Sequence, residues 1–152
     1  MYKNPLQGYQ EIDKAGMTGR DVEAYALTKA AMALRECQQK WDSPERGQLL
    51  DHALKLNGRI WSIFQAELTR VDNPMPPQIK QNILKLGAFI DQRSIEVIAS
   101  PIPEALNIII SINENLAAGL RESMADEAES SAEETNLNHH PAAHNPTASM
   151  AP

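Results

Sequence analysis

One apolar stripe, from Leu50 to Val71, constrains the fold of this chain more than any other feature. Its apolar residues recur in steps of three and four, and the phase passes unbroken through Asn57 and Gly58. Asn-Gly is a strong hairpin signal, because both residues tolerate positive φ. A turn would change the phase, so the stripe predicts one continuous helix despite the roughly 1 kcal/mol that glycine costs relative to alanine.

Two helices are predicted in the first half of the chain. The first begins near Thr18, where Asp21 stands three residues later in a variant of the capping box, and it extends to about Trp41. The second carries the stripe. It is predicted to begin with Ser43 as N-cap and Pro44 at the first helical position, where the missing N–H does no harm.

Two more helices are predicted in the second half, after a proline-rich loop that cannot be helical. The third begins at Pro76 or Pro77, and its apolar face comprises Ile79, Ile83, Leu86, Ile90 and Val97, widened by Leu84, Phe89, Ile95 and Ile98. The fourth begins at about Pro103, and its inward face comprises Leu106, Ile109, Ile110, Asn113, Leu116, Ala117 and Leu120. Strand signals are weak, so the predicted fold class is an all-α bundle of about four helices.

The two ends of the chain lie outside this helical pattern. Residues 1–17 are predicted to form an N-terminal arm that docks through Tyr9, and residues 18–122 the helical domain. Residues 123–152 are acidic and then rich in His, Pro and Ala, without apolar periodicity. Such a segment buries too little surface to offset its ordering entropy, so a disordered tail is predicted.

Charge and composition favour a cytoplasmic protein. The net charge is −6, of which −5 falls from Arg121 onward, so the body is near neutral and no basic footprint for nucleic acid stands out. The N-terminus lacks the apolar region of a secretory signal, and no apolar run approaches the ~20 residues of a membrane span. Cys37 is the single cysteine, which fits a reducing compartment.

The chain carries none of the short motifs that mark an enzyme, so no catalytic residue and no cofactor are predicted. The alternative is a catalytic pair in which Cys37 is the nucleophile and His52 the base. Nothing in the sequence places these two residues near each other, so Cys37 is interpreted as a half-buried helix cysteine. The tail histidines are the alternative metal ligands, yet they lie on unstructured chain without a second shell, so no metal is predicted. They are His139, His140 and His144.

Asn57 and Asn113 interrupt the apolar stripes of the second and fourth helices. If these helices are neighbours, the two amides can hydrogen-bond each other or nearby backbone. They then either fix helix register, as Asn does in coiled coils, or line a groove that receives a partner helix. Gly58 indicates close approach by another backbone, beside the large aromatic side chains that follow it. The predicted partner-binding residues are Asn57, Trp61, Phe64, Asn113 and Leu116.

Three stretches, "LLDHALKLNGRIWSIFQAEL", "NPMPPQIKQNILKLGAFI" and "PEALNIIISINENLAAGL", resemble the FlaF family of flagellar biosynthesis regulators of alphaproteobacteria. The resemblance covers about residues 9–120. Its matching positions are Asn57 and Trp61, then Asn73, Met75 and Pro76, then Ile112, Asn113, Gly119 and Leu120. The chain departs from the family pattern in three places. Arg59 is displaced by one position, Met75 stands for leucine, and Ala88-Phe89 replaces a tryptophan-like position.

The resemblance implies a non-enzymatic secretion chaperone that binds flagellin and regulates its synthesis, in opposition to FlbT. A helical bundle with an apolar groove fits this role, because unpolymerised flagellin has long amphipathic terminal helices. One alternative is an RNA-linked regulator of flagellin translation, and another is an adaptor that binds only FlbT. The RNA alternative requires the basic residues to cluster on one surface, namely Arg35, Lys40, Arg46, Lys55 and Arg59.

Overall fold

The computed structural model describes residues 19–138, which are almost entirely helical. The elements are α2 (Gly19–Gln39), α3 (Arg46–Leu68), α4 (Pro77–Ala99), the 3-10 turn η1 (Pro103–Leu106) and α5 (Asn107–Asn138). These residues contain no strand, which confirms the predicted all-α class. None of the helices between residues 19 and 138 combines the length and the hydropathy that crossing a membrane requires.

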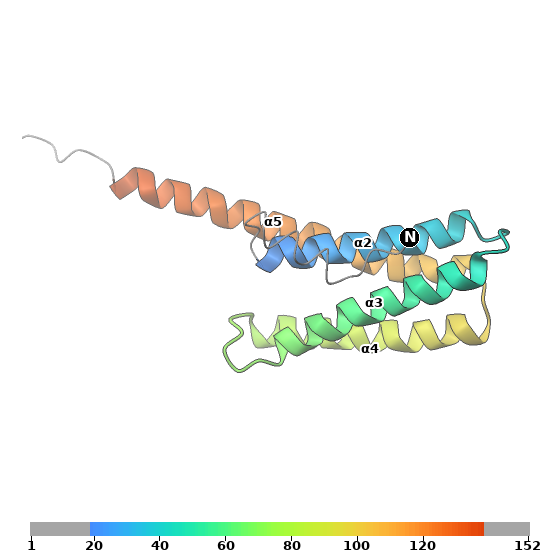
Figure 1. Cartoon of the computed structure of the whole chain (residues 1–152). Coiled ribbons are helices and arrows are strands. Elements are labelled where there is room, and N and C mark those ends of the chain that lie inside the picture. The colour runs from blue at the N-terminus through green and yellow to red at the C-terminus, as the bar shows by residue number, and fades with distance from the viewer. Residues whose placement is uncertain (1–18, 139–152) are drawn as a thin grey trace, which may run out of the picture.

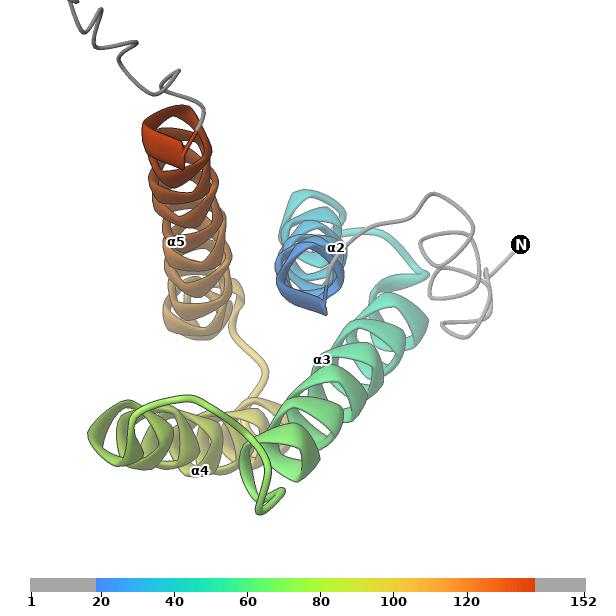
Figure 2. The same cartoon turned by 90° about the vertical axis from the view of Figure 1, so that its left-hand side faces the viewer.

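Helix α2 lies between α3 and α5 and packs extensively against both (Figure 2). Close approach is possible because four of the seven side chains that α2 buries are alanines, namely Ala24, Ala26, Ala30 and Ala31. Leu27 and Leu34 fill the remaining space and are fully buried. Helix α4 packs on α3 and stands apart from α5 at the other side of the molecule (Figures 1 and 2).

Helix α3 runs without interruption through Asn57 and Gly58, which confirms the continuous helix predicted from the apolar phase. Its beginning differs from the prediction, since Ser43 is not the N-cap and the helix starts at Arg46. The backbone N–H of Arg46 donates to the carbonyl of Ser43 at 3.1 Å. Ser43, Pro44 and Glu45 therefore form a tight turn, and the helical hydrogen-bond pattern begins only after it.

The apolar face of α4 is buried less than its periodicity indicates. Ile83, Ile90 and Val97 lie in the core as predicted. Five residues that were predicted to form or widen this face are instead exposed, namely Ile79, Leu86, Phe89, Ile95 and Ile98. The reason is that α3 is the only long helix in the described part of the chain that packs extensively against α4.

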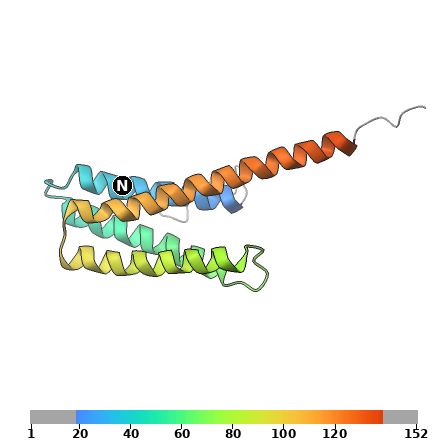
Figure 3. The same ribbon diagram turned by 180° about the vertical axis from the view of Figure 1, so that it is seen from behind.

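Helix α5 continues to Asn138, so the predicted disorder is wrong for residues 123–138. Its C-terminal part projects beyond the bundle as a single helix (Figures 1 and 3). No Gly or Pro follows Gly119 within α5, and extending an existing helix requires no new nucleation. The predicted N-terminal arm with Tyr9, and the tail from residue 139 onward, lie outside the described residues.

Candidate functional site

A chain of buried polar side chains joins α3 to α5 in the centre of the bundle. The indole Nε1–H of Trp61 donates to Oδ1 of Asn113 at 2.8 Å. The Nδ2–H of Asn113 in turn donates to Oδ1 of Asn57 at 2.7 Å. Both asparagines are completely buried and Trp61 almost so. The predicted hydrogen bond between the two amides is therefore confirmed.

This chain of hydrogen bonds specifies how α3 and α5 align. If α5 slid by one turn, Asn113 would lose both of its partners while it remained in an apolar core. An unsatisfied buried polar group costs about 1–3 kcal/mol, so the observed alignment is favoured over shifted ones. The geometry supports the interpretation of these amides as determinants of helix register. Nδ2 of Asn57 finds no acceptor within the described residues.

The other two predicted partner-binding residues lie beside this chain. Phe64 is buried and its ring meets that of Trp61 edge-on, with 6.0 Å between the ring centroids. Leu116 is half-buried and packs against the core. The structure thus brings all five predicted partner-binding residues together in one core. Of these five, only Leu116 is appreciably exposed. Their role in binding a partner stays a prediction, and it would require the bundle to open at Asn57, Trp61, Phe64 and Asn113.

The interpretation of Gly58 as a close-approach glycine is wrong. A Cβ atom added to Gly58 would meet no neighbouring heavy atom within 4 Å. The close approach is instead at Gly87 on α4, where an added Cβ would collide with the side-chain amide of Gln65 and lie 3.4 Å from Cε3 of Trp61. Gly87 falls on the buried face of α4 in the apolar periodicity, and this position could have identified it as the close-approach glycine.

These two glycines give a matched stability prediction. Gly58→Ala is expected to raise the free energy of unfolding by about 0.5–1 kcal/mol, because alanine removes backbone entropy from the unfolded chain and meets open space in the fold. Gly87→Ala should stabilise less, since Gln65 must give up its position. Urea unfolding followed by circular dichroism measures both variants, and a destabilised Gly58→Ala would contradict the open space at that position.

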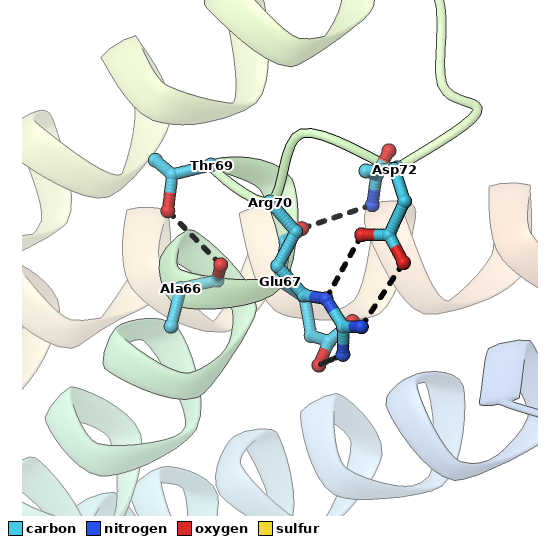
Figure 4. Close-up of polar contacts among 6 residues, drawn as sticks. Ala66, Glu67, Thr69, Arg70 and Asp72 are labelled. Atoms are coloured by element: carbon cyan, nitrogen blue, oxygen red, sulfur yellow. Dashed lines mark hydrogen bonds and ion pairs between the residues drawn. The ribbon is translucent and has the colours of Figure 1, made fainter.

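The loop between α3 and α4 is held by its own polar side chains (Figure 4). The Arg70 guanidinium binds both carboxylate oxygens of Asp72 at 3.1 Å and lowers the pKa of that carboxyl group. Asn73 donates to the carbonyl of Glu67 and accepts from the backbone N–H of Met75. Asn73 is one of the FlaF-like positions, and its contacts give it a structural role at the start of α4.

Exposed apolar side chains flank the buried face of α4 on both sides. We define the α4 surface by Ile79, Leu86, Phe89, Ile95 and Ile98. Ile95 is 61% exposed and Ile98 65%, which are high values for isoleucine on a helix. Arg93 lies among them with its guanidinium over the Phe89 ring, 5.8 Å from the centroid. Exposed apolar side chains that gather on one element are a feature of interaction sites.

Among residues 19–138, the remaining candidates from the sequence do not assemble into a reactive site. Cys37 is fully buried, and burial raises the pKa of its thiol, so the nucleophilic thiolate is disfavoured. Within residues 19–138 no three His, Cys, Asp or Glu side chains are grouped to hold a metal ion. The three tail histidines lie outside the described residues.

Three of the five basic residues that the RNA alternative requires lie in ion pairs. Arg35 pairs with Glu114 at 2.7 Å, Lys40 with Glu36 at 2.9 Å and Lys55 with Asp51 at 2.8 Å. Arg46 lies over the ring of Trp41. Each ion pair places a carboxylate next to the cation, which weakens the local positive potential that a phosphate backbone would need.

Comparison with known proteins assigns the family. No curated protein and no solved structure matches the chain. The sequence model of the family described as "Flagellar protein FlaF" matches residues 5–120, which is well over half of the chain and includes the hydrogen-bonded core and the α4 surface. The chain therefore belongs to the FlaF family of flagellar proteins.

Proposed function

We propose that this chain binds flagellin in the cytoplasm before export, as a non-enzymatic chaperone that also regulates flagellin synthesis. The single observation that carries the proposal is the exposed α4 surface in a member of a flagellar family. Helix α4 buries one face against α3 and leaves apolar side chains on both flanks of that face. An amphipathic helix of an unpolymerised flagellin is an occupant that needs such a surface, because its own apolar face aggregates in water.

The polar contacts on the α4 surface indicate the chemistry of the bound helix. Nε of Arg93 is buried and has no acceptor among the described residues, although its Nη1 lies 3.2 Å from Glu96. The Arg93 side chain is still 36% exposed, so a partner can reach its terminal guanidinium nitrogens, which form charge-assisted hydrogen bonds with carboxylates. We therefore expect the bound flagellin helix to carry a carboxylate or amide oxygen between its apolar positions, next to Arg93.

Titration of the full-length protein with monomeric flagellin tests this proposal. Phe89→Glu is expected to weaken binding by roughly 10-fold or more, because it places a charge among the exposed apolar side chains of one flank of α4. Met32→Glu is the matched control, since Met32 is a 56% exposed apolar residue on α2. It should bind as the unaltered chain does. Circular dichroism verifies that both variants remain folded.

Two outcomes would overturn the proposal in different ways. Absence of binding at about 50 µM, with both proteins folded, removes the chaperone function. Equal weakening by Phe89→Glu and Met32→Glu removes the α4 surface as the site. An FlbT protein measured in parallel separates the adaptor alternative, which predicts binding of FlbT without binding of flagellin.

A further inference from the structure

A hollow of about 320 Å³ opens between the beginning of α2 and the end of α3, on a part of the molecule that the proposed function does not use. Its walls are mostly apolar and come from both helices. The lining residues are Gly19, Val22, Glu23, Ala26, Ile60, Ile63, Phe64 and Glu67. Ile63 is 43% exposed there, which leaves apolar area without a covering element among the described residues.

Two carboxylates give this hollow a negative character. Burial raises the pKa of Glu23, the neighbouring charge of Glu67 raises it further, and Arg20 opposes both effects. Glu67 also lies 3.6 Å from the guanidinium of Arg70, on the side of the α3–α4 loop. A half-buried carboxylate next to a second one is stabilised by a cation placed between them. The hollow thus fits an occupant with apolar side chains and at least one positive charge.

Residues 5–18 of this chain have that composition and are connected to the hollow. Gly19 forms part of the rim, so the segment enters at the site itself. The segment carries apolar residues at three-residue intervals, Leu6, Tyr9 and Ile12, and one cation, Lys14, next to two acidic residues, Glu11 and Asp13. The chain from Lys14 to Gly19 can span at most about 17 Å, which keeps the ammonium group within reach of both carboxylates. The family match begins at residue 5, so the segment lies within the region that the FlaF family model covers.

We propose that residues 5–18 occupy this hollow, with Tyr9 and Ile12 on the apolar wall at Ile63 and Lys14 beside Glu23 and Glu67. The segment then covers the apolar area that α2 and α3 leave open. Its covalent connection gives it a high effective concentration at the site, so a modest contact area is sufficient for docking. The proposal concerns a surface distinct from α4 and stands whether or not flagellin binds there.

Methyl NMR of the full-length protein, labelled at the isoleucine δ1 methyl groups, tests this docking. A tyrosine ring within a few ångströms shifts a methyl resonance, so Tyr9→Ala is expected to move the Ile60 and Ile63 signals. Ile95 and Ile98 on α4 should not move, and they report that the fold is intact. Tyr2→Ala is the matched control, because Tyr2 is also a tyrosine but precedes the family match. It should leave Ile63 unchanged.

The charge contact has its own readout in the same protein. Lys14→Glu is expected to raise the pKa of Glu23 further, as measured from its side-chain carboxyl 13C shift during a pH titration. Three results would overturn the proposal. They are an Ile63 signal that is insensitive to Tyr9→Ala, an Ile63 shift that depends on protein concentration and so indicates a second copy, and a shift that occurs only when flagellin is added.

Discussion

Replacing Asn113 by leucine is expected to lower the free energy of unfolding by about 2–5 kcal/mol, although leucine is apolar and similar in size. Asn113 accepts from Trp61 and donates to Asn57, and all three side chains are buried. The substitution leaves the indole N–H and the Asn57 carbonyl oxygen without partners in an apolar core. Urea unfolding of the variant and the unaltered chain measures the difference.

Asn57→Leu provides the internal comparison for this prediction. Asn57 makes one of the two hydrogen bonds, and its own Nδ2 lacks an acceptor among the described residues, so its removal also eliminates an unsatisfied donor. We expect Asn57→Leu to cost less than Asn113→Leu, and the double variant to cost less than the sum of the two. Equal and additive losses would show that the amides do not act as one hydrogen-bonded unit.

The same variants separate the two interpretations of the buried amides. A register role predicts altered stability or self-association for Asn57→Leu, with flagellin binding retained in whatever fraction remains folded. A groove role predicts a normal fold that no longer binds flagellin. Size-exclusion chromatography and flagellin titration of Asn57→Leu, under conditions in which most of the variant is folded, distinguish the register role from the groove role.

Periodicity predicted the buried side of α3 and α5 because each of these helices packs against α2 through one continuous stripe. Residues at steps of three and four from Leu50 to Leu68 are all buried, with Asn57 among them, whereas Val71, the last residue of the predicted stripe, lies beyond the end of α3 and is exposed. The phase through Asn57 and Gly58 outweighed the local turn preference of the dipeptide. The hydrogen bond between Asn57 and Asn113 followed from the same reasoning, once the two helices were taken as neighbours.

The prediction failed where the number of neighbouring helices mattered. Ile95 and Ile98 continue the apolar pattern of α4, but periodicity does not say how many helices cover a face, and only α3 packs extensively on this one. The pattern of α5 ends after Leu120, yet the helix continues to Asn138. The loss of periodicity there marked the end of the core face, while intrinsic propensity maintained the helix. Residue type alone cannot tell which of Gly58 and Gly87 is closely approached by a neighbour, because both are helix glycines and the approach at Gly87 depends on Gln65 and Trp61 of another helix.

Trp61→Ala is expected to lower the free energy of unfolding by about 3–5 kcal/mol, at least as much as Asn113→Leu does. It creates a large cavity and also removes the hydrogen-bond donor to Asn113. Trp41→Ala is the matched control. Trp41 is half-buried beyond the end of α2, where Arg46 lies over its ring. Its loss should cost much less. Circular dichroism during urea unfolding measures both variants without relying on tryptophan fluorescence.

The loss of stability that Trp61→Ala causes should also differ from one helix to another. Trp61 lies against Gly87 of α4, and α4 has no other long helix packed extensively against it among the described residues. Hydrogen exchange in α4 should therefore accelerate more than in α2, which is held between α3 and α5. Uniform acceleration in all helices would show that α4 is not attached mainly through this contact. A selectively loosened α4 with weakened flagellin binding would instead connect the core to the α4 surface, because the helix that presents that surface is positioned from within by Trp61.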